Sequence, residues 1–432
     1  MARITIETYG CTLNRAESEI MGSLLEREGH DVTLGRYAGA RGCDCLIINT
    51  CTVKAPTEQR ILDRLRALRG LGGRLIVAGC MASANRDAIW KAVPEASIVG
   101  TGSIHKIGDA VSAAMAGRRT VYSARARGDK LAGYDASCRC GRGVVARIPI
   151  AEGCLSGCAF CESRFARGPL RSFSEGRILD AVGAKVANGA REVDLTAQDA
   201  GAYGLDRGTD IAELVAKAAE VPGDFRIRVG MLNPEHLGGY IDRLVEAYSS
   251  EKVFRFIHLP IQSASDRVLR EMNRRYTVDE VDGHIRELRR KVRGISVETD
   301  IIVGYPTETE EDFRATLGWI RRMRPAMVNI SRFGPRPHAS ASRLPQLGGR
   351  TAKERSGEAT RVVREVLLKE RERLIGGKDS VLITEKGGGS FSGKGRGYLA
   401  FEVRGPGLRV GDSVDVSITG CSPFCLIGEK VK

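Results

Sequence analysis

The segment Cys154-Leu155-Ser156-Gly157-Cys158-Ala159-Phe160-Cys161 places three cysteines at a C-x3-C-x2-C spacing. Three thiolates this close in sequence can bind three irons of a [4Fe–4S] cluster while the fourth iron has no protein ligand. A zinc site usually shows two pairs of cysteine or histidine ligands, and no fourth partner stands at such a spacing here. The segment therefore predicts a cluster whose open iron can take the amino and carboxylate groups of S-adenosylmethionine.

Strand-like and helix-like stretches alternate around this segment. Apolar runs predict six strands, at residues 147–152, 192–196, 225–229, 253–259, 296–303 and 327–333. Amphipathic stretches such as Glu175–Ala187 and Val278–Lys291 predict helices between them. Repeated units of this kind predict a partial (β/α)6 barrel, with its chemistry at the carboxyl ends of the strands.

Polar side chains stand at or just beyond the predicted strand ends. They are Gln198, Asp199, Arg228, Gln262, Ser263, Glu298 and Asp300. Barrel geometry aims such residues at the pocket, and carboxylates and amides can accept hydrogen bonds from the ribose and amino groups of S-adenosylmethionine. Simple capping of the strands is the alternative for each. Phe160, next to the last cysteine, can shield the cluster and completes the predicted cofactor-binding set.

The N-terminal part of the chain predicts a second α/β unit. Apolar runs at residues 4–9, 45–49, 75–78 and 97–99 alternate with helical patterns such as those at 15–27 and 57–68, which favours a parallel sheet covered by helices. Cys11, Cys51 and Cys80 each follow one of these strands. Since strand carboxyl ends line one crevice, these thiols can converge on a second cluster; separate buried thiols are the alternative.

The rest of the chain predicts a basic connector and a small β module. The connector carries Arg118, Arg119, Arg125, Arg127, Lys130, Arg139, Arg142 and Arg147 against Asp129 and Asp135. Either solvated charge or phosphate contact explains this excess. A charged helix covers residues 351–374, and the short alternating runs after residue 378 predict a five-stranded barrel. The predicted domain limits are 1–117, 118–146, 147–374 and 375–432.

Composition narrows the class of protein. The 432 residues include 67 Lys and Arg against 53 Asp and Glu, a net charge of +14 that favours a polyanionic partner, with nucleic acid as the first expectation. No run approaches the ~18 apolar residues of a membrane span, and the first residues predict a strand. We therefore expect a cytoplasmic protein whose cysteines are thiols or metal ligands. No role is assigned to Cys43, Cys45, Cys138, Cys140, Cys421 and Cys425.

These motifs together resemble those of the radical S-adenosylmethionine methylthiotransferases over nearly the whole chain. In the N-terminal domain they are Tyr9-Gly10-Cys11-Thr12-Leu13-Asn14, Asn49-Thr50-Cys51-Thr52-Val53 and Ala78-Gly79-Cys80. In the barrel they are Gly153–Cys161, His258–Asp266, Met272–Tyr276 and Asp300–Pro306. The C-terminal module resembles the family's TRAM domain, an RNA-binding barrel. Thr307, where a glycine is usual, and His338-Ala339-Ser340-Ala341, in place of Gly-Thr-Pro-Ala, depart from the pattern.

Within the family, Phe165–Ser172, Leu195–Asp199 and Ala202–Gly204 resemble the archaeal and eukaryotic branch. That resemblance implies a tRNA substrate with N6-threonylcarbamoyladenosine at position 37, converted at C2 of the adenine to the 2-methylthio derivative. The alternatives within the family are isopentenyladenosine-37 of tRNA and an aspartate of a ribosomal protein. An alternative of another class is a non-catalytic iron–sulfur RNA-binding protein, which would not require an open iron.

The resemblance also implies roles for residues and partners. Cys154, Cys158 and Cys161 would hold the cluster that cleaves S-adenosylmethionine to a deoxyadenosyl radical, and Cys11, Cys51 and Cys80 the auxiliary cluster that presents sulfur. A second S-adenosylmethionine would supply the methyl group. Partners would be the tRNA anticodon stem-loop, an electron donor of the ferredoxin or flavodoxin type, and a sulfur donor. Because a buried carboxylate needs a cationic or amide donor, candidate contacts to the threonyl carboxylate are Arg164, Arg167, Arg171, Arg332 and Arg336.

Overall fold

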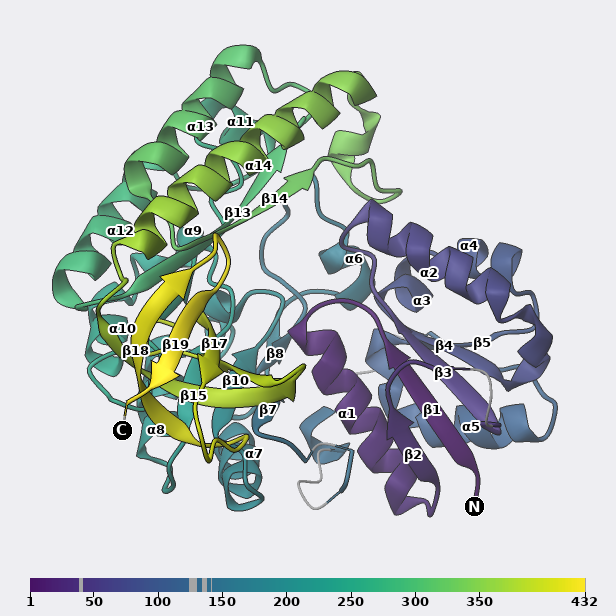
Figure 1. Cartoon of the computed structure of the whole chain (residues 1–432). Helices are drawn as coiled ribbons and strands as arrows, with labels where there is room; N and C mark the ends of the chain where they lie inside the picture. The colour runs from purple at the N-terminus through teal and green to yellow at the C-terminus, as the bar shows by residue number, and fades with distance from the viewer. Residues whose placement is uncertain (39–41, 124–129, 134–137, 141, 432) are drawn as a thin grey trace.

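The computed structural model describes residues 1–38, 42–123, 130–133, 138–140 and 142–431. It shows an N-terminal sheet domain beside a partial barrel, with a small closed barrel against the latter (Figure 1). Part of the connector prediction, on Arg125, Arg127, Asp129 and Asp135, lies outside the described residues. Among the described residues, no helix combines the length and the apolar character required to cross a bilayer.

The N-terminal domain is a six-stranded sheet in the order β2-β1-β3-β4-β5-β6, with all neighbours parallel. Its strands are β1 (Arg3–Thr8), β2 (Asp31–Leu34), β3 (Cys45–Thr50), β4 (Leu75–Gly79), β5 (Ser97–Gly100) and β6 (Val121–Tyr122). Its helices are α1 (Thr12–Arg27), α2 (Ala55–Ala67), α3 (Cys80–Ala84), α4 (Arg86–Ala92) and α5 (Ile107–Met115), with 3-10 turns η1 (Arg69–Arg74) and η2 (Thr101–Lys106).

Both faces of this sheet are covered, which is why its central strands are continuous apolar runs. Side chains of α1 and α5 pack on one face and those of α2 and α4 on the other, and every residue of β3 is buried. Strands β2 and β6 were not predicted. Both are short edge strands in which Val32 is the one buried residue, so they carry little apolar periodicity. Strand β6 also lies beyond the predicted domain limit at residue 117.

The central domain contains six parallel strands whose order in space follows their order in the chain. They are β7 (Val145–Pro149), β10 (Glu192–Thr196), β11 (Arg226–Val229), β12 (Phe256–His258), β13 (Ser296–Val303) and β14 (Met327–Arg332). They form the ladders β7-β10-β11 and β12-β13-β14, which a parallel bridge between Ile227 and Val253 joins. The predicted partial barrel is confirmed. A short antiparallel pair, β8 (Ala151–Glu152) with β9 (Arg171–Ser172), closes the loop that follows β7.

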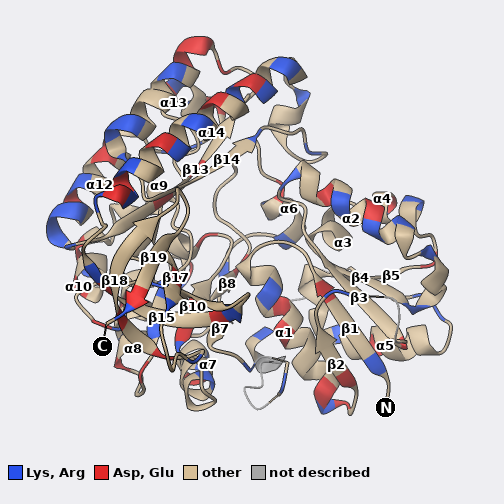
Figure 2. Cartoon of the chain, in the orientation of Figure 1, with Lys and Arg blue, Asp and Glu red and all other residues tan. Residues whose placement is uncertain are grey.

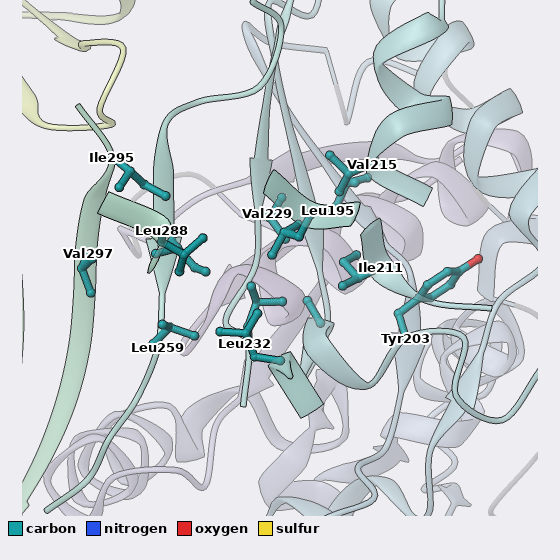
Figure 3. Close-up of a cluster of buried hydrophobic side chains, with 14 of the residues drawn as sticks. Leu195, Tyr203, Ile211, Val215, Val229, Leu232, Leu259, Leu288, Ile295 and Val297 are labelled. Carbon is teal, nitrogen blue, oxygen red and sulfur yellow. The ribbon is translucent and has the colours of Figure 1, made fainter. Parts of the chain in front are cut away.

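Most helices of this domain cover the outside of the barrel. They are α7 (Glu175–Ala187), α8 (Ile211–Glu220), α9 (Pro234–Leu237), α10 (Ile241–Ala247), α11 (Asp266–Glu271), α12 (Val278–Lys291), α13 (Glu310–Met323) and α14 (Gly349–Glu372), with 3-10 turns η3 (Lys130–Gly133), η4 (Ala200–Ala202) and η5 (Ser340–Arg343). The short helix α6 (Ser163–Arg167) instead packs against α3 of the N-terminal domain. Figure 3 shows part of the core, where Leu195 and Val229 of the strands meet Ile211 and Val215 of α8. This core fixes the strand ends that carry the site.

The C-terminal module is a closed barrel in the order β15-β16-β17-β19-β18, as predicted. Its strands are β15 (Lys378–Gly387), β16 (Ser390–Lys394), β17 (Ala400–Arg404), β18 (Ser413–Cys421) and β19 (Leu426–Lys430). It packs against the amino ends of the central strands. Tyr398 contacts the rings of Phe254 and Phe256 and donates a hydrogen bond of 2.8 Å from its hydroxyl to Glu192.

Candidate active site

The loop that carries Cys154, Cys158 and Cys161 follows β8 at the carboxyl end of β7, and backbone contacts hold it at both ends. Gly153 has φ of +77°, and a Cβ there would lie 2.0 Å from the carbonyl oxygen of Pro169, so only glycine fits. The Gly153 amide donates to Oε1 of Gln198 at 3.0 Å. Further along, the Ala159 amide donates to the Met272 carbonyl at 3.0 Å.

Two donors point at the sulfurs of this loop. Arg274 Nη1 lies 3.3 Å from Cys158 Sγ, and the Ser163 amide lies 3.4 Å from Cys161 Sγ. Burial raises the pKa of Cys154 to about 12 and that of Cys158 above its ordinary value, although Arg274 opposes the second shift. Thiols of this kind stay protonated at neutral pH until a metal displaces the proton, so they suit metal ligation better than free-thiol chemistry.

The second cysteine triad lies at the carboxyl ends of three neighbouring strands. Cys11 caps α1 after β1, Cys51 follows β3, and Cys80 begins α3 after β4. In the strand order β2-β1-β3-β4, β2 is added on one side of β1 and β3 on the other, so the strand order reverses between β1 and β3. Open α/β sheets bind ligands at such a topological switch point. A Cβ on Gly10 would lie 2.7 Å from that of Cys51, so glycine permits this close approach.

A buried ion-pair network joins this triad to the barrel. Arg167 of α6 donates from Nε to Cys80 Sγ at 3.2 Å and from Nη1 to Glu17 of α1 at 2.6 Å. Lys130 binds the same Glu17 at 2.6 Å and Glu152 of β8 at 2.5 Å. Arg167 is therefore committed to protein carboxylates rather than to a substrate carboxylate, and Lys130 is not a phosphate contact, because buried cations require such counterions.

A cavity of about 350 Å³ lies between the cluster loop, the carboxyl ends of β13 and β14, and the start of α2. Six of the predicted site residues line it: Phe160, Cys161, Gln262, Asp300, Arg332 and Arg336. Glu162 and Lys54 line it as well. Buried Arg336 donates to Glu58 at 2.6 Å, but its Nη2 has no hydrogen-bond partner among the described residues, and neither has Glu162 Oε1. Two residues that line the cavity therefore each carry a buried polar atom without a hydrogen-bond partner, one a donor and the other an acceptor.

Comparison with known proteins places the chain in a family. Residues 3–100 match the model of the uncharacterized protein family UPF0004, and residues 148–320 match that of the radical SAM superfamily. The probable threonylcarbamoyladenosine tRNA methylthiotransferase of Pyrococcus abyssi is 40% identical over 90% of this chain and 90% of its own length. The human threonylcarbamoyladenosine tRNA methylthiotransferase is 31% identical over 91% of this chain and 67% of its own.

The chain belongs to the threonylcarbamoyladenosine tRNA methylthiotransferase family. The resemblance inferred from the motifs is confirmed, including its archaeal and eukaryotic branch. Among solved structures, the radical S-adenosylmethionine methyltransferase TsrM from Kitasatospora setae has the same fold, with a TM-score of 0.58 at 15% identity over 79% of this chain and 74% of TsrM. As a radical SAM enzyme of this family, the chain uses S-adenosylmethionine and [4Fe–4S] clusters.

The donor sets fit these cofactors. Each triad consists of cysteines alone, the ligands that iron–sulfur clusters use. Among the described residues, no three His, Cys, Asp or Glu side chains converge tightly enough for a single metal ion. A cluster does not require that, because each thiolate binds a different iron and the thiolates stand farther apart.

The other predicted residues occupy three environments. The first group accepts hydrogen bonds from backbone amides and consists of Gln198, Asp199 and Ser263. Asp199 accepts from the amides of Gly201 and Asn233, both at 3.0 Å. Ser263 accepts from the Ser265 amide at 3.3 Å. Glu298 accepts from Asn329 at 2.8 Å beside the cavity wall. Arg228 lies away from the cavity, with its guanidinium over the rings of Phe256 and Tyr398.

Two of the flanking arginines also have protein partners. Arg164 donates to the Leu155 carbonyl at 3.2 Å and is exposed, while Arg171 lies 3.7 Å from Glu152 and lines a separate cavity with Arg167. The predictions for these residues as cofactor or substrate contacts stay predictions.

The sequence alone did not single out Lys54 or Arg274 as site residues, and it left His258 as either a pocket residue or a core histidine. His258 Nε2 lies 2.9 Å from Asp300, and the hydrogen bonds from His258 and Asn329 lower the pKa of Asp300 despite its burial. Lys54 comes from the N-terminal domain and reaches a cavity of the barrel, and Arg274 is 116 positions from Cys158. Only the Met272–Tyr276 motif hinted at Arg274.

Proposed function

We propose that this chain converts N6-threonylcarbamoyladenosine-37 of tRNA to its 2-methylthio derivative by adding sulfur and a methyl group at C2 of the adenine. The relatives are named for this nucleoside and match 90% and 91% of the chain. The cavity beside Cys161 carries the proposal, because it combines a cluster cysteine with Lys54, Arg332 and Arg336. Such cations suit the carboxylate of a threonylcarbamoyl group, whereas an isopentenyl group is wholly apolar.

We assign Cys154, Cys158 and Cys161 to the cluster that binds S-adenosylmethionine, and Cys11, Cys51 and Cys80 to the auxiliary cluster. When bound, these groups supply the one-electron chemistry that activates C2 and the sulfur that is inserted there. Arg274 and Ser163 donate to thiolates of the first triad, and Arg167 to one of the second. Such donors orient the ligands and set the potential of a cluster.

Lys54 and Arg332 are the substrate contacts that we favour. Both are exposed, line the cavity, and have no ion-pair partner among the described residues. Arg336 is more restricted because Glu58 holds one of its nitrogens. Asp300, which His258 and Asn329 keep ionised, can accept a hydrogen bond from the ribose or amino group of S-adenosylmethionine.

The remaining parts of the proposal concern partners and placement. The modified base must leave its stack to enter the cavity, which costs least in a single-stranded anticodon loop. An electron donor of the ferredoxin or flavodoxin type and a sulfur donor must act on the protein, and we place the reaction in the cytoplasm. The division of the chain at residues 117, 146 and 374 also stays a proposal; the N-terminal sheet extends past the first limit to β6, and the barrel begins with β7 at Val145, before the second.

Two modified anticodon stem-loops offered to the reconstituted enzyme test the substrate. One carries threonylcarbamoyladenosine and the other isopentenyladenosine, and mass spectrometry of the nucleosides measures the product. We expect methylthiolation of the first stem-loop only, and a larger loss of turnover in Lys54→Met than in Lys54→Arg, which keeps the charge. Equal turnover of both stem-loops would place the chain's substrate elsewhere in the family.

A further inference from the structure

Two cavities on the N-terminal side of the molecule form one continuous groove. The first, of about 820 Å³, lies over the ends of β1 and β2 between α1 and α2. The second, of about 540 Å³, lies between β2, β7 and β15. Glu19, Leu34 and Arg147 line both cavities, so the two meet. The groove therefore runs from the C-terminal barrel across the N-terminal domain.

Three arginines from three different elements give this groove its charge. Arg15 of α1, Arg36 after β2 and Arg60 of α2 all line it and are exposed. None of the three has a carboxylate partner within the part of the chain that the structure describes; the contact found for Arg60 is with the hydroxyl of Thr57 at 3.3 Å. Their charges are therefore available to a ligand.

The acidic side chains of the groove do not cancel these charges. Glu7 is bound by Arg64 at 2.9 Å, Glu19 by Arg147 at 2.9 Å, and Asp63 by Arg66 at 2.6 Å. Each of these three carboxylates thus already has its own cation, and Glu385, the remaining acidic residue that lines the groove, lies at its C-terminal-barrel end, away from Arg15, Arg36 and Arg60. The groove consequently presents a net positive surface with planar guanidinium groups, which bind phosphate oxygens in pairs.

The groove connects the C-terminal barrel to the region of the second cysteine triad. At one end stand Thr384 and Glu385 of the C-terminal barrel. At the other end Tyr9 lies two positions before Cys11 of the second triad. Helix α2 links the groove to the active cavity, since Pro56 lines the cavity and Arg60 the groove, about 6 Å apart along the helix axis.

From this geometry we infer that the groove binds the sugar-phosphate backbone of the substrate RNA, with Arg15, Arg36 and Arg60 as phosphate contacts. This inference rests on the proposed function, which makes tRNA the substrate. The N-terminal domain would thereby hold the RNA as well as the second triad. Contacts to phosphate position a nucleic acid without reading its sequence, so the groove fixes where the anticodon loop lies relative to the cavity.

A charge-matched pair of variants tests the inference in the reconstituted full-length protein. The test variant is R15Q/R36Q/R60Q. The control is R290Q/R321Q/R361Q, which removes three exposed arginines without ion-pair partners among the described residues from α12, α13 and α14. Those helices form the opposite side of the molecule and carry mixed charge (Figure 2). Fluorescence anisotropy with a tRNA transcript measures affinity between 50 and 300 mM salt, and iron content and melting temperature report folding.

Each lost phosphate contact should lower the salt dependence. We expect R15Q/R36Q/R60Q to bind tRNA about 10- to 100-fold more weakly at 0.1 M salt, with a slope of log affinity against log salt smaller by about 2 to 3. The control should keep the wild-type affinity and slope. Equal binding by both triple variants and the wild type would overturn the inference but leave the proposed function standing. A wild-type protein that binds no tRNA would overturn both.

Discussion

Glu17 shows how a single buried side chain joins the domains. It accepts hydrogen bonds from Arg167 of the barrel and from Lys130 of the connector, both at 2.6 Å. Burial alone would raise the pKa of Glu17, but Arg167 and Lys130 together lower it from 4.5 to about 2. Glu19, two positions along the same helix, has the opposite balance, since burial outweighs Arg147 and raises its pKa to about 7.

These opposite pKa shifts predict that replacing each carboxylate with a neutral amide costs a different amount of folding free energy. Glu17→Gln should destabilise the fold by about 3 kcal/mol at pH 7, because it leaves two buried cations short of a counterion. Glu19→Gln, the control, should cost about 1 kcal/mol or less, since that carboxyl is already partly protonated. Melting temperatures measure both. Because the pKa of Glu17 is lowered on folding, its contribution is present above pH 4.5 and lost as the pH falls toward 2. A gap between wild type and Glu17→Gln that stays constant down to pH 2 would contradict this assignment.

At the scale of elements, the cluster loop is held by its backbone. Gly153 needs its positive φ and lies against the Pro169 carbonyl. A Cβ on Gly157 of the same loop would instead meet two side chains, that of Asn273 at 3.3 Å and that of Arg164 at 3.8 Å. The two glycines thus allow a test of loop geometry without a change of ligand.

Gly153→Ala should displace the loop and lose one cluster, leaving about four of eight irons per chain after reconstitution. Gly157→Ala should keep both clusters, because the Asn273 side chain can shift slightly. Iron analysis and electron paramagnetic resonance of the reduced protein measure the outcome. Full iron content in Gly153→Ala would show that the loop tolerates a shifted backbone at this point.

The sequence predicted some elements of the fold and site but not the contacts between distant residues. Buried strands such as β4 and β10, and amphipathic helices such as α7 and α12, were predictable because burial imposes a period on the sequence. The cysteine spacing predicted the first cluster loop. The partners of Arg167 and Lys130 were not predictable, since Glu17 is 150 positions from Arg167 and 113 from Lys130, and charge alone cannot distinguish a buried ion pair from a phosphate contact.

At the scale of the whole molecule, one active centre draws residues from separate parts of the chain. Lys54 of the N-terminal domain faces the same cavity as Arg332 of the barrel, and Arg336 is bound to Glu58 of α2. The C-terminal barrel contacts the opposite end of the central strands through Tyr398. Cys80 of the second triad lies at the interface between the N-terminal domain and the barrel, beside Arg167, and the buried network of Arg167, Glu17 and Glu152 stabilises that interface.

Iron content and product mass, measured on the same samples, test this two-cluster centre most directly. The wild-type protein should hold about eight irons and convert threonylcarbamoyladenosine in a stem-loop to its methylthio derivative. The triple variant with Cys11, Cys51 and Cys80 changed to Ala should hold about four irons, still cleave S-adenosylmethionine reductively, and form no methylthio product. A triple variant with unchanged iron content, or one that still methylthiolates the nucleoside, would contradict the assignment of the second triad.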